Sequence, residues 1–106
     1  MAASIIVLYE NLAGARFDMD YYMTKHMPLV GERFARFGLK EWRVVKSAGT
    51  LDDSPARFSV CAILEFDKPE QFKEAAAAEG STVFGDVPNF SSVMPVLMIS
   101  EAVGSS

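Results

Sequence analysis

The nine residues Phe58-Ser59-Val60-Cys61-Ala62-Ile63-Leu64-Glu65-Phe66 form a long, mostly apolar stretch rich in β-branched and aromatic side chains. The polar loop Asp52-Asp53-Ser54-Pro55 comes just before it, and such a run bounded by turn residues is typical of a buried strand. Further upstream, Glu41–Lys46 alternates imperfectly between polar and apolar residues. The sequence therefore predicts a half-exposed strand followed by a buried one.

Toward the N-terminus, a helix and another strand are expected. Asp18 is placed to cap the helix, and acidic Asp20 in the first turn favours the positive end of the helix dipole. The helix should run to about Phe37, with Gly38 just past its end. Before it, Ser4–Glu10 contains five consecutive apolar residues and predicts a first strand.

A proline and a stripe of apolar residues inside this helix predict how it bends and packs. Pro28 has no backbone donor, so a kink or break is expected near His26-Met27. At about 100° per residue, one apolar stripe is expected, made of Met19, Met23, Met27, Val30, Phe34 and Phe37.

Toward the C-terminus, the sequence predicts a second helix over Pro69–Glu79 that Gly80 ends. Asp67 and Glu70 have the spacing of a capping box at its start. An irregular return with one helical turn is expected over residues 81–90. The last strand is expected over residues 92–99.

The resulting order is βαββαβ, which predicts an α+β, ferredoxin-like domain: a four-stranded antiparallel sheet with two main helices. In this topology the first and third strands are central, and they are the most apolar here. Pro95 falls in the expected fourth strand, where an edge tolerates a missing donor. We expect one domain over residues 1–106, with a flexible tail at 104–106.

Both faces of the expected sheet are apolar. In the first strand Ile5, Val7 and Tyr9 alternate with Ile6 and Leu8, whereas a solvated face should be polar. An uncovered second face would be larger than monomers usually expose. We therefore predict a homodimer in which two sheets pack face to face, forming a dimeric α/β barrel.

Composition excludes several classes of function. The chain has 106 residues, 50% of them apolar, and its 10 basic against 14 acidic residues give a net charge of −4. A nucleic-acid or anionic-membrane partner would require a basic face, so neither is expected. No apolar run approaches the roughly 18 residues of a membrane span, and the N-terminus lacks the features of a signal peptide. The single cysteine, Cys61, suits a reducing cytoplasm.

His26 is the single histidine and follows Tyr22 by four residues, so ideal geometry places both on the same helical face. A neutral imidazole there could act as general acid or base, with the Tyr22 hydroxyl orienting it or binding a substrate oxygen. The alternative is a structural histidine hydrogen-bonded at the kink made by Pro28.

An apolar pocket is the second candidate feature. Its lining could include Met23, Met27, Trp42, Phe66 and Phe84, although the same side chains could be ordinary core packing. One histidine and one cysteine fall short of a metal site, so no metal is expected. Cys61 lies among apolar neighbours and is expected to be an inert core thiol. No nucleotide-binding or serine-hydrolase motif is present.

The stretch Phe17–Val30 closely resembles the signature of the EthD family, whose kernel is an aromatic residue, Tyr and then His-x-Pro-Leu. Gly85–Phe90 resembles that family's second motif, and Val7–Tyr9 and Ala15-Arg16 fit as well. The resemblance covers essentially the whole chain. It implies a dimeric α/β barrel related to small monooxygenases, isomerases and cyclases.

The resemblance implicates His26 first, then Tyr22 and Pro28. Asp86, Pro88 and Asn89 form a second implicated patch, and Asn89 joins the candidate substrate-binding residues. It implies oxidoreductase or related isomerase or cyclase chemistry, with no cofactor expected.

Two hypotheses follow. The chain is a cofactor-independent enzyme in which His26 moves a proton on a small apolar organic molecule, or a non-catalytic ligand-binding or accessory protein.

Overall fold

A computed structural model describes residues 2–106, and Met1, part of the expected domain, lies outside the described residues. The elements follow the predicted order: β1 (Ala3–Glu10), α1 (Met19–Tyr21), the π-helical turn η1 (Tyr22–His26), α2 (Met27–Phe34), the 3-10 turn η2 (Ala35–Phe37), β2 (Glu41–Lys46), β3 (Phe58–Phe66), α3 (Pro69–Gly85), the 3-10 turn η3 (Val87–Asn89) and β4 (Val96–Glu101).

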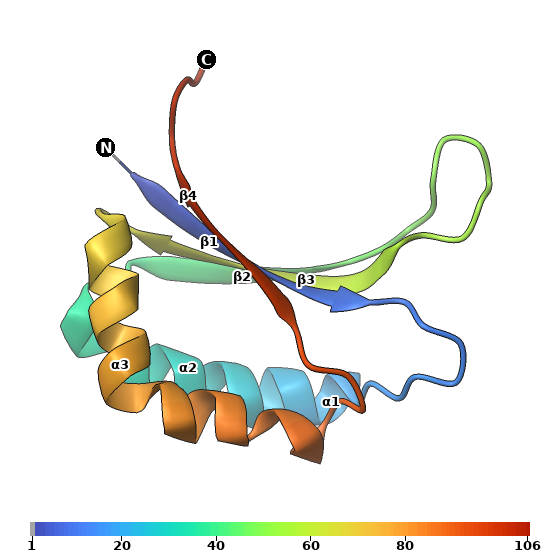
Figure 1. Cartoon of the computed structure of the whole chain (residues 1–106), viewed down its shortest axis with the longest axis horizontal. Helices are drawn as coiled ribbons and strands as arrows, with labels where there is room; N and C mark the ends of the chain where they lie inside the picture. Colours follow the sequence, from blue (N-terminus) through green and yellow to red (C-terminus); the bar gives the residue numbers. More distant parts are fainter. Residues whose placement is uncertain (1) are drawn as a thin grey trace.

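The four strands form one antiparallel sheet in the order β2-β3-β1-β4, so the first and third strands are central as predicted. In the register, Ile5 of β1 lies between Leu64 of β3 and Ile99 of β4. The helices cover one face of the sheet, and the segment between β2 and β3 extends away from them (Figure 1). Within residues 2–106, no helix combines the length and apolar character that crossing a membrane requires.

The core lies between the sheet and the helices. Alternate residues of β1 are buried, and Ala3, Ile5 and Tyr9 are almost fully shielded. From the helices, Met27, Phe34 and Phe72 pack against them. Burying each such large apolar side chain contributes about 1.5–3 kcal/mol to folding.

The opposite face of the sheet carries apolar side chains that no helix covers. On β4, Val96 and Met98 are 47% and 49% exposed. They pair with Leu8 and Ile6, which point to the same open face of β1. The prediction of apolar side chains on both faces is confirmed for β1 and β4, whereas Glu41, Arg43 and Glu65 make the β2–β3 side of the open face charged. The expectation that Cys61 is a core residue is wrong: it alternates with buried Val60 and Ala62 and lies half-buried on the open face.

The first helix starts and ends where predicted, but its interior differs. The Asp18 carboxylate accepts a hydrogen bond from the Tyr21 amide (3.1 Å), and Gly38 adopts a left-handed conformation (φ 101°) just past Phe37. The turn η1 inserts a wider hydrogen-bonding pattern, in which the Met27 amide bonds to the Tyr22 carbonyl five residues earlier. Pro28 favours this, because its ring would clash with the carbonyl four residues earlier in a regular α-helix.

The wider turn changes which side chains face the core. The simple stripe placed Met23 inward, whereas 38% of Met23 is exposed and Tyr22 and His26 are buried. The ideal α-helical periodicity does not hold across a π turn, so this part of the stripe was wrong.

Three predictions near the C-terminus were also wrong: the end of the second helix, the residue that caps its start, and the start of the last strand. The second helix continues through Gly80 to Gly85, because Gly80 and Val83 are buried in the core and packing overrides the weak helix propensity of glycine. It begins at Pro69 as predicted, but the Gln71 side chain, rather than that of Glu70, accepts hydrogen bonds from the Asp67 and Lys68 amides. β4 starts at Val96, so Pro95 lies just before the edge strand.

Candidate functional site

His26, which is buried, pairs with the half-buried Asp86 between the first helix and the end of α3. The Nδ1 atom of His26 lies 3.0 Å from Oδ2 of Asp86. Only 4% of His26 is exposed, and its ring contacts Phe90 with centroids 4.5 Å apart. The two residues are 60 positions apart in the chain, so tertiary structure alone brings them together.

Asp86 is held on its other oxygen as well. Oδ1 of Asp86 accepts hydrogen bonds from the Tyr21 hydroxyl (2.7 Å) and the Asn89 side-chain amide (2.9 Å). A carboxylate with three partners is fixed in place and is strongly favoured in its ionised form. Asp86 also caps the C-terminal end of α3, where the helix dipole disfavours a negative charge. These partners offset that unfavourable position.

The charge states of the pair follow from burial and these bonds. Burial lowers the pKa of His26 below its ordinary value, and Asp86 opposes that shift without cancelling it. For Asp86, burial acts to raise the pKa, but the bonds from Asn89, Tyr21 and His26 outweigh burial and lower it. At neutral pH the pair is therefore a neutral imidazole beside a carboxylate.

The protonation states fix the tautomer of His26. An ionised carboxylate only accepts hydrogen bonds, so the proton of neutral His26 must reside on Nδ1, facing Asp86. The Nε2 atom then carries the free lone pair. This is the arrangement in which a carboxylate orients a histidine to act as a base.

Tyr22 stacks on His26, with ring centroids 5.4 Å apart and planes inclined by 14°. The π turn aligns these two rings, which confirms that they share one helical face. Tyr22 is fully buried, and its hydroxyl has no hydrogen-bond partner among the described residues. Burial raises its pKa well above the ordinary value, so the phenol stays protonated.

Aromatic side chains surround this pair of rings. Tyr9, Phe17 and Phe90 each lie within ring-contact distance of Tyr22, with centroids 4.9 to 5.7 Å apart. The backbone amide of Asp18 donates to the Phe90 carbonyl (2.7 Å), which ties the start of the helix to the segment after α3. We call Tyr9, Phe17, Tyr22, His26 and Phe90 the aromatic cluster.

The remaining predicted site residues do not gather at His26. Phe66 packs on Phe72 beside Ala3, at the opposite end of β1 from Tyr9. Six residues of strand separate these ends, a distance of about 20 Å. Met27 is buried in the core, Phe84 is half-buried on α3, and Asn89 reaches His26 only through Asp86.

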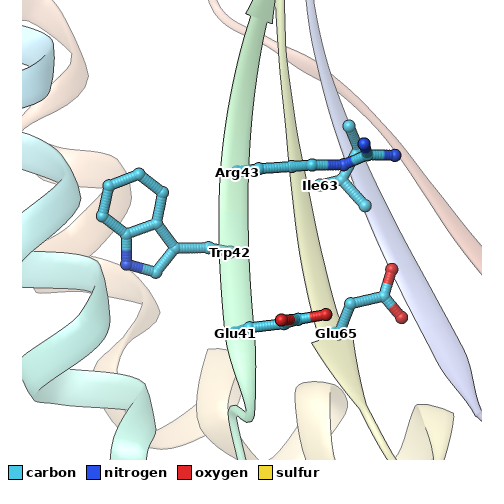
Figure 2. A pocket seen from close by; sticks show the side chains of 5 residues that line it. All are labelled: Glu41, Trp42, Arg43, Ile63 and Glu65. Atoms are coloured by element: carbon cyan, nitrogen blue, oxygen red, sulfur yellow. The ribbon is translucent and has the colours of Figure 1, made fainter.

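Trp42 points from β2 toward α2, where its indole nitrogen approaches Gly31. Its neighbours line a hollow of about 210 Å³ on the open face of the sheet, formed by Glu41, Trp42, Arg43, Ile63 and Glu65. Figure 2 shows Trp42 directed to the helices and the other four side chains directed away from them. This hollow lies across the sheet from the space between sheet and helices where a ligand cavity was expected.

Tyr21 is the participant that sequence reasoning missed. Its signal was present, because it is the aromatic residue beside Tyr22 in the motif, but its role depends on reaching Asp86 of α3. As for a resident metal, no group of three or more His, Cys, Asp or Glu side chains that could hold one is found in residues 2–106.

Comparison with known proteins identifies the family. No protein-family model matches the chain, and no curated protein is similar enough to count as a match. A crystal structure of an EthD-like protein from Ralstonia eutropha JMP134 is 33% identical, with a TM-score of 0.88 over 99% of this chain and 95% of that one. The present chain belongs to the EthD family.

Two further structures share the EthD fold at lower identity. An EthD-family protein from Bacillus halodurans C-125 is 24% identical, with a TM-score of 0.75 over 97% of this chain and 100% of that one. A dimeric ferredoxin-like protein of unknown function from Jannaschia sp. CCS1 is 14% identical, with a TM-score of 0.56 over 95% and 98% of the two chains. Both agree with the ferredoxin-like topology described above.

Proposed function

We propose that this EthD-family protein is a cofactor-independent proton-transfer enzyme acting on a small, largely apolar carbonyl compound. The observation that carries the proposal is the pairing of buried His26 with Asp86, which three hydrogen bonds hold in place. Removing titratable groups from water costs free energy. Proteins keep such costly arrangements mainly at functional sites, and here the hydrogen bonds hold the imidazole in one orientation. Chemistry of the oxidoreductase, isomerase or cyclase type would begin with the step that this pair supports.

In that step Nε2 of His26 accepts a proton from the carbon next to the substrate carbonyl. The electron pair of the broken C–H bond moves into the carbonyl, which becomes an enolate oxygen. The resulting imidazolium is stabilised by Asp86. Return of the proton from Nε2 to the same carbon restores the substrate and neutral His26, with hydrogen exchange as the only net result, whereas its delivery to a different carbon of a conjugated enolate completes an isomerisation.

Tyr22 supplies the second proposed role. Among residues 2–106, its buried hydroxyl makes no well-formed hydrogen bond, although it interacts with the Tyr9 hydroxyl, and a buried donor left unpaired costs about 1–3 kcal/mol. A substrate oxygen that accepted this hydrogen bond would remove that penalty and gain stabilisation as negative charge develops. The catalytic roles of His26 and Tyr22 are thus assigned to adjacent, stacked rings.

The proposal includes the walls of the ligand site. Because 4% of His26 is exposed, a ligand can reach Nε2 only if neighbouring side chains move. Phe90 lies against it and directly follows the turn η3, so we expect both Phe90 and this turn to respond to binding. The residues nearest in sequence to this region, Met23, Met27 and Asn89, are proposed as further ligand contacts.

We further propose that the protein is a cytoplasmic homodimer. The exposed apolar face of the sheet supports the dimer, and the Jannaschia structure with the same fold is described as dimeric. Face-to-face packing of two sheets would bury this face at the usual separation of about 10 Å. A cytoplasmic site agrees with a single, half-buried cysteine.

Deuterium exchange tests the enzymatic proposal directly. Pools of small ketones and esters are incubated in heavy water with the protein, and deuterium at the carbon next to the carbonyl is followed by NMR. We expect wild-type protein to accelerate exchange for at least one pool, His26→Ala to abolish it and Asp86→Asn to slow it at least about 100-fold. Asp67→Asn, a matched change at an exposed carboxylate, should leave the rate unchanged. Exchange undiminished in His26→Ala would remove His26 from the mechanism.

One observation favours the alternative, a ligand-binding or accessory protein. Because Asp86 is engaged by three hydrogen bonds, His26 is the one group of the described site left to accept a proton from a ligand, and it is buried in the free chain. Binding of a compound that is neither exchanged nor converted would support this second function, and Tyr22→Phe should then weaken binding as strongly as His26→Ala does.

A further inference from the structure

The hollow on the open face of the sheet contains charges of both signs. Glu41 and Glu65 are direct cross-strand partners on β2 and β3, and Arg43 lies opposite Ile63, two pairs along. The two carboxylates lie together at one end of the hollow, with the guanidinium at the other (Figure 2). Like charges placed directly opposite each other on a sheet are destabilising.

These charges are not neutralised within the chain. Among the ion pairs of residues 2–106, none involves Glu41, Arg43 or Glu65. Glu65 accepts a hydrogen bond from the Ser4 hydroxyl (2.7 Å), and Lys40, the basic residue beside Glu41 in the chain, pairs with Asp67 instead. Within the described residues, the carboxylate pair and the arginine therefore lie on the same face without an ion-pair partner.

This pattern is complementary to a second copy of itself. In a two-fold dimer each contact occurs twice: if one residue of the first copy touches a second residue of the other copy, the same contact forms with the two copies exchanged. Arg43 of each copy can then lie against the carboxylate pair of the other. The hollow adjoins the exposed apolar side chains of the same face, because Ile63 of β3 pairs with Ile6 of β1, which in turn pairs with Met98.

We propose that the hollow is a docking site for Arg43 of a second copy, with Glu41 and Glu65 as its anionic partners. This inference rests on the proposed homodimer and adds the contact that sets its register. The apolar surface supplies the attraction, whereas the reciprocal ion pairs select one arrangement of the two sheets among several. Each pair would be shielded from water by the surrounding interface, so it would contribute more than an exposed ion pair.

Charge-reversal variants test the contact by complementation. Arg43→Glu places three carboxylates together, and the double variant Glu41→Arg with Glu65→Arg places three guanidinium groups together. We expect each variant alone to raise the dimer dissociation constant at least about 100-fold in sedimentation at micromolar concentration. An equimolar mixture of the two variants should form heterodimers within about tenfold of the wild-type constant, because both contacts are then between opposite charges.

Three results would overturn the inference. If wild-type protein is monomeric, the proposed dimer fails, and this contact fails with it. If wild type is dimeric and the variants dimerise equally well, or if mixing restores nothing, the dimer stands but the charge contact is wrong. Lys73→Glu, a matched reversal on the exposed face of α3, controls for net charge, and circular dichroism verifies folding.

A second measurement covers the case in which a variant does not fold. Raising the salt concentration screens the attraction between Arg43 and the two carboxylates. The wild-type dimer should therefore weaken as salt increases. A dissociation constant that stays unchanged or falls would contradict the inference.

Discussion

The two faces of the sheet differ in opposite ways: one buries polar groups and the other exposes apolar side chains. On the covered face, the aromatic cluster buries a histidine, a carboxylate neighbour and a tyrosine hydroxyl that has no partner. On the open face, apolar side chains such as Val96 and Met98 remain half exposed. Buried polar groups without partners and exposed apolar groups without cover are both unfavourable. The unpaired hydroxyl on the covered face could be satisfied by a polar group of a ligand. The exposed apolar side chains on the open face could be buried by another protein surface.

The largest expected effect comes from removing the centre of the aromatic cluster. Phe90 is fully buried and contacts Tyr22 and His26, so Phe90→Ala should lower the free energy of unfolding by about 3–5 kcal/mol. Urea denaturation measures this change. Leu51→Ala, at a fully exposed loop position, should change stability by less than about 0.5 kcal/mol. Equal effects of the two variants would contradict the assignment of the core.

A charge on the open face should affect assembly rather than folding. Met98 is 49% exposed on β4, and Met98→Asp would place two carboxylates near each other inside the proposed interface. We expect the dimer dissociation constant to rise at least about 100-fold, while circular dichroism stays unchanged. Ser81→Asp, on the exposed side of α3, should leave the constant near that of wild type. An unaffected dimer in Met98→Asp would mean that copies do not pack through this face.

Loss of the anion beside His26 should have an intermediate effect. Asp86→Asn replaces the carboxylate that bonds to Tyr21, His26 and Asn89 with a neutral amide, which weakens or breaks these hydrogen bonds. The free energy of unfolding should fall by about 1–3 kcal/mol. The pKa of His26 should fall further, because the attraction of Asp86 that partly opposes burial is removed. Because the chain has one histidine, a single imidazole resonance reports this. A rise of the His26 pKa would contradict the described electrostatics.

The covered face should also make stability depend on pH. His26 has a lowered pKa in the folded protein, so below about pH 6.5 the unfolded chain binds a proton that the folded chain resists. The free energy of unfolding should therefore fall with pH below that point, by at most about 1.4 kcal/mol per pH unit, until the folded-state pKa is reached. Denaturation of wild type and His26→Gln between about pH 7 and pH 5 measures the difference, and the variant should show the flatter profile.

The smallest expected change distinguishes a ligand site from a structural one. The Tyr22 hydroxyl is buried without a partner, so Tyr22→Phe should change stability by less than about 0.5 kcal/mol or increase it slightly. The same variant should weaken ligand binding or exchange at least about tenfold. A large loss of stability would show that the hydroxyl has a structural partner after all.

Much of the fold could be predicted from the sequence because its signals are local. The cap at Asp18, the left-handed Gly38 and the apolar strands each depend on residues close together in the chain. Gly80 misled the prediction because its helical conformation is imposed by burial rather than by propensity. Periodicity likewise failed at Met23, because a π turn shifts the faces of the helix.

The candidate site was only half predictable for a related reason. The alignment of Tyr22 with His26 follows from their spacing, whereas the pairing of His26 with Asp86 joins segments 60 positions apart. The family resemblance pointed to Asp86 without giving its role, and Tyr21 acts only through Asp86. Phe66 and Trp42 were placed in the pocket because aromatic composition does not say which end of the sheet a side chain occupies.

The central claim is that His26 is a neutral, oriented base in a ligand site, and titration of its imidazole resonance tests this most directly. The spectrum is followed through pH with and without pools of small aromatic and aliphatic carbonyl compounds. We expect the His26 pKa to lie below 6.5 and to shift further when one pool of compounds is added. In Tyr22→Phe, the same pool should not shift the His26 pKa. A pKa at or above 6.5 that no pool changes would make His26 a structural residue and contradict the proposed site.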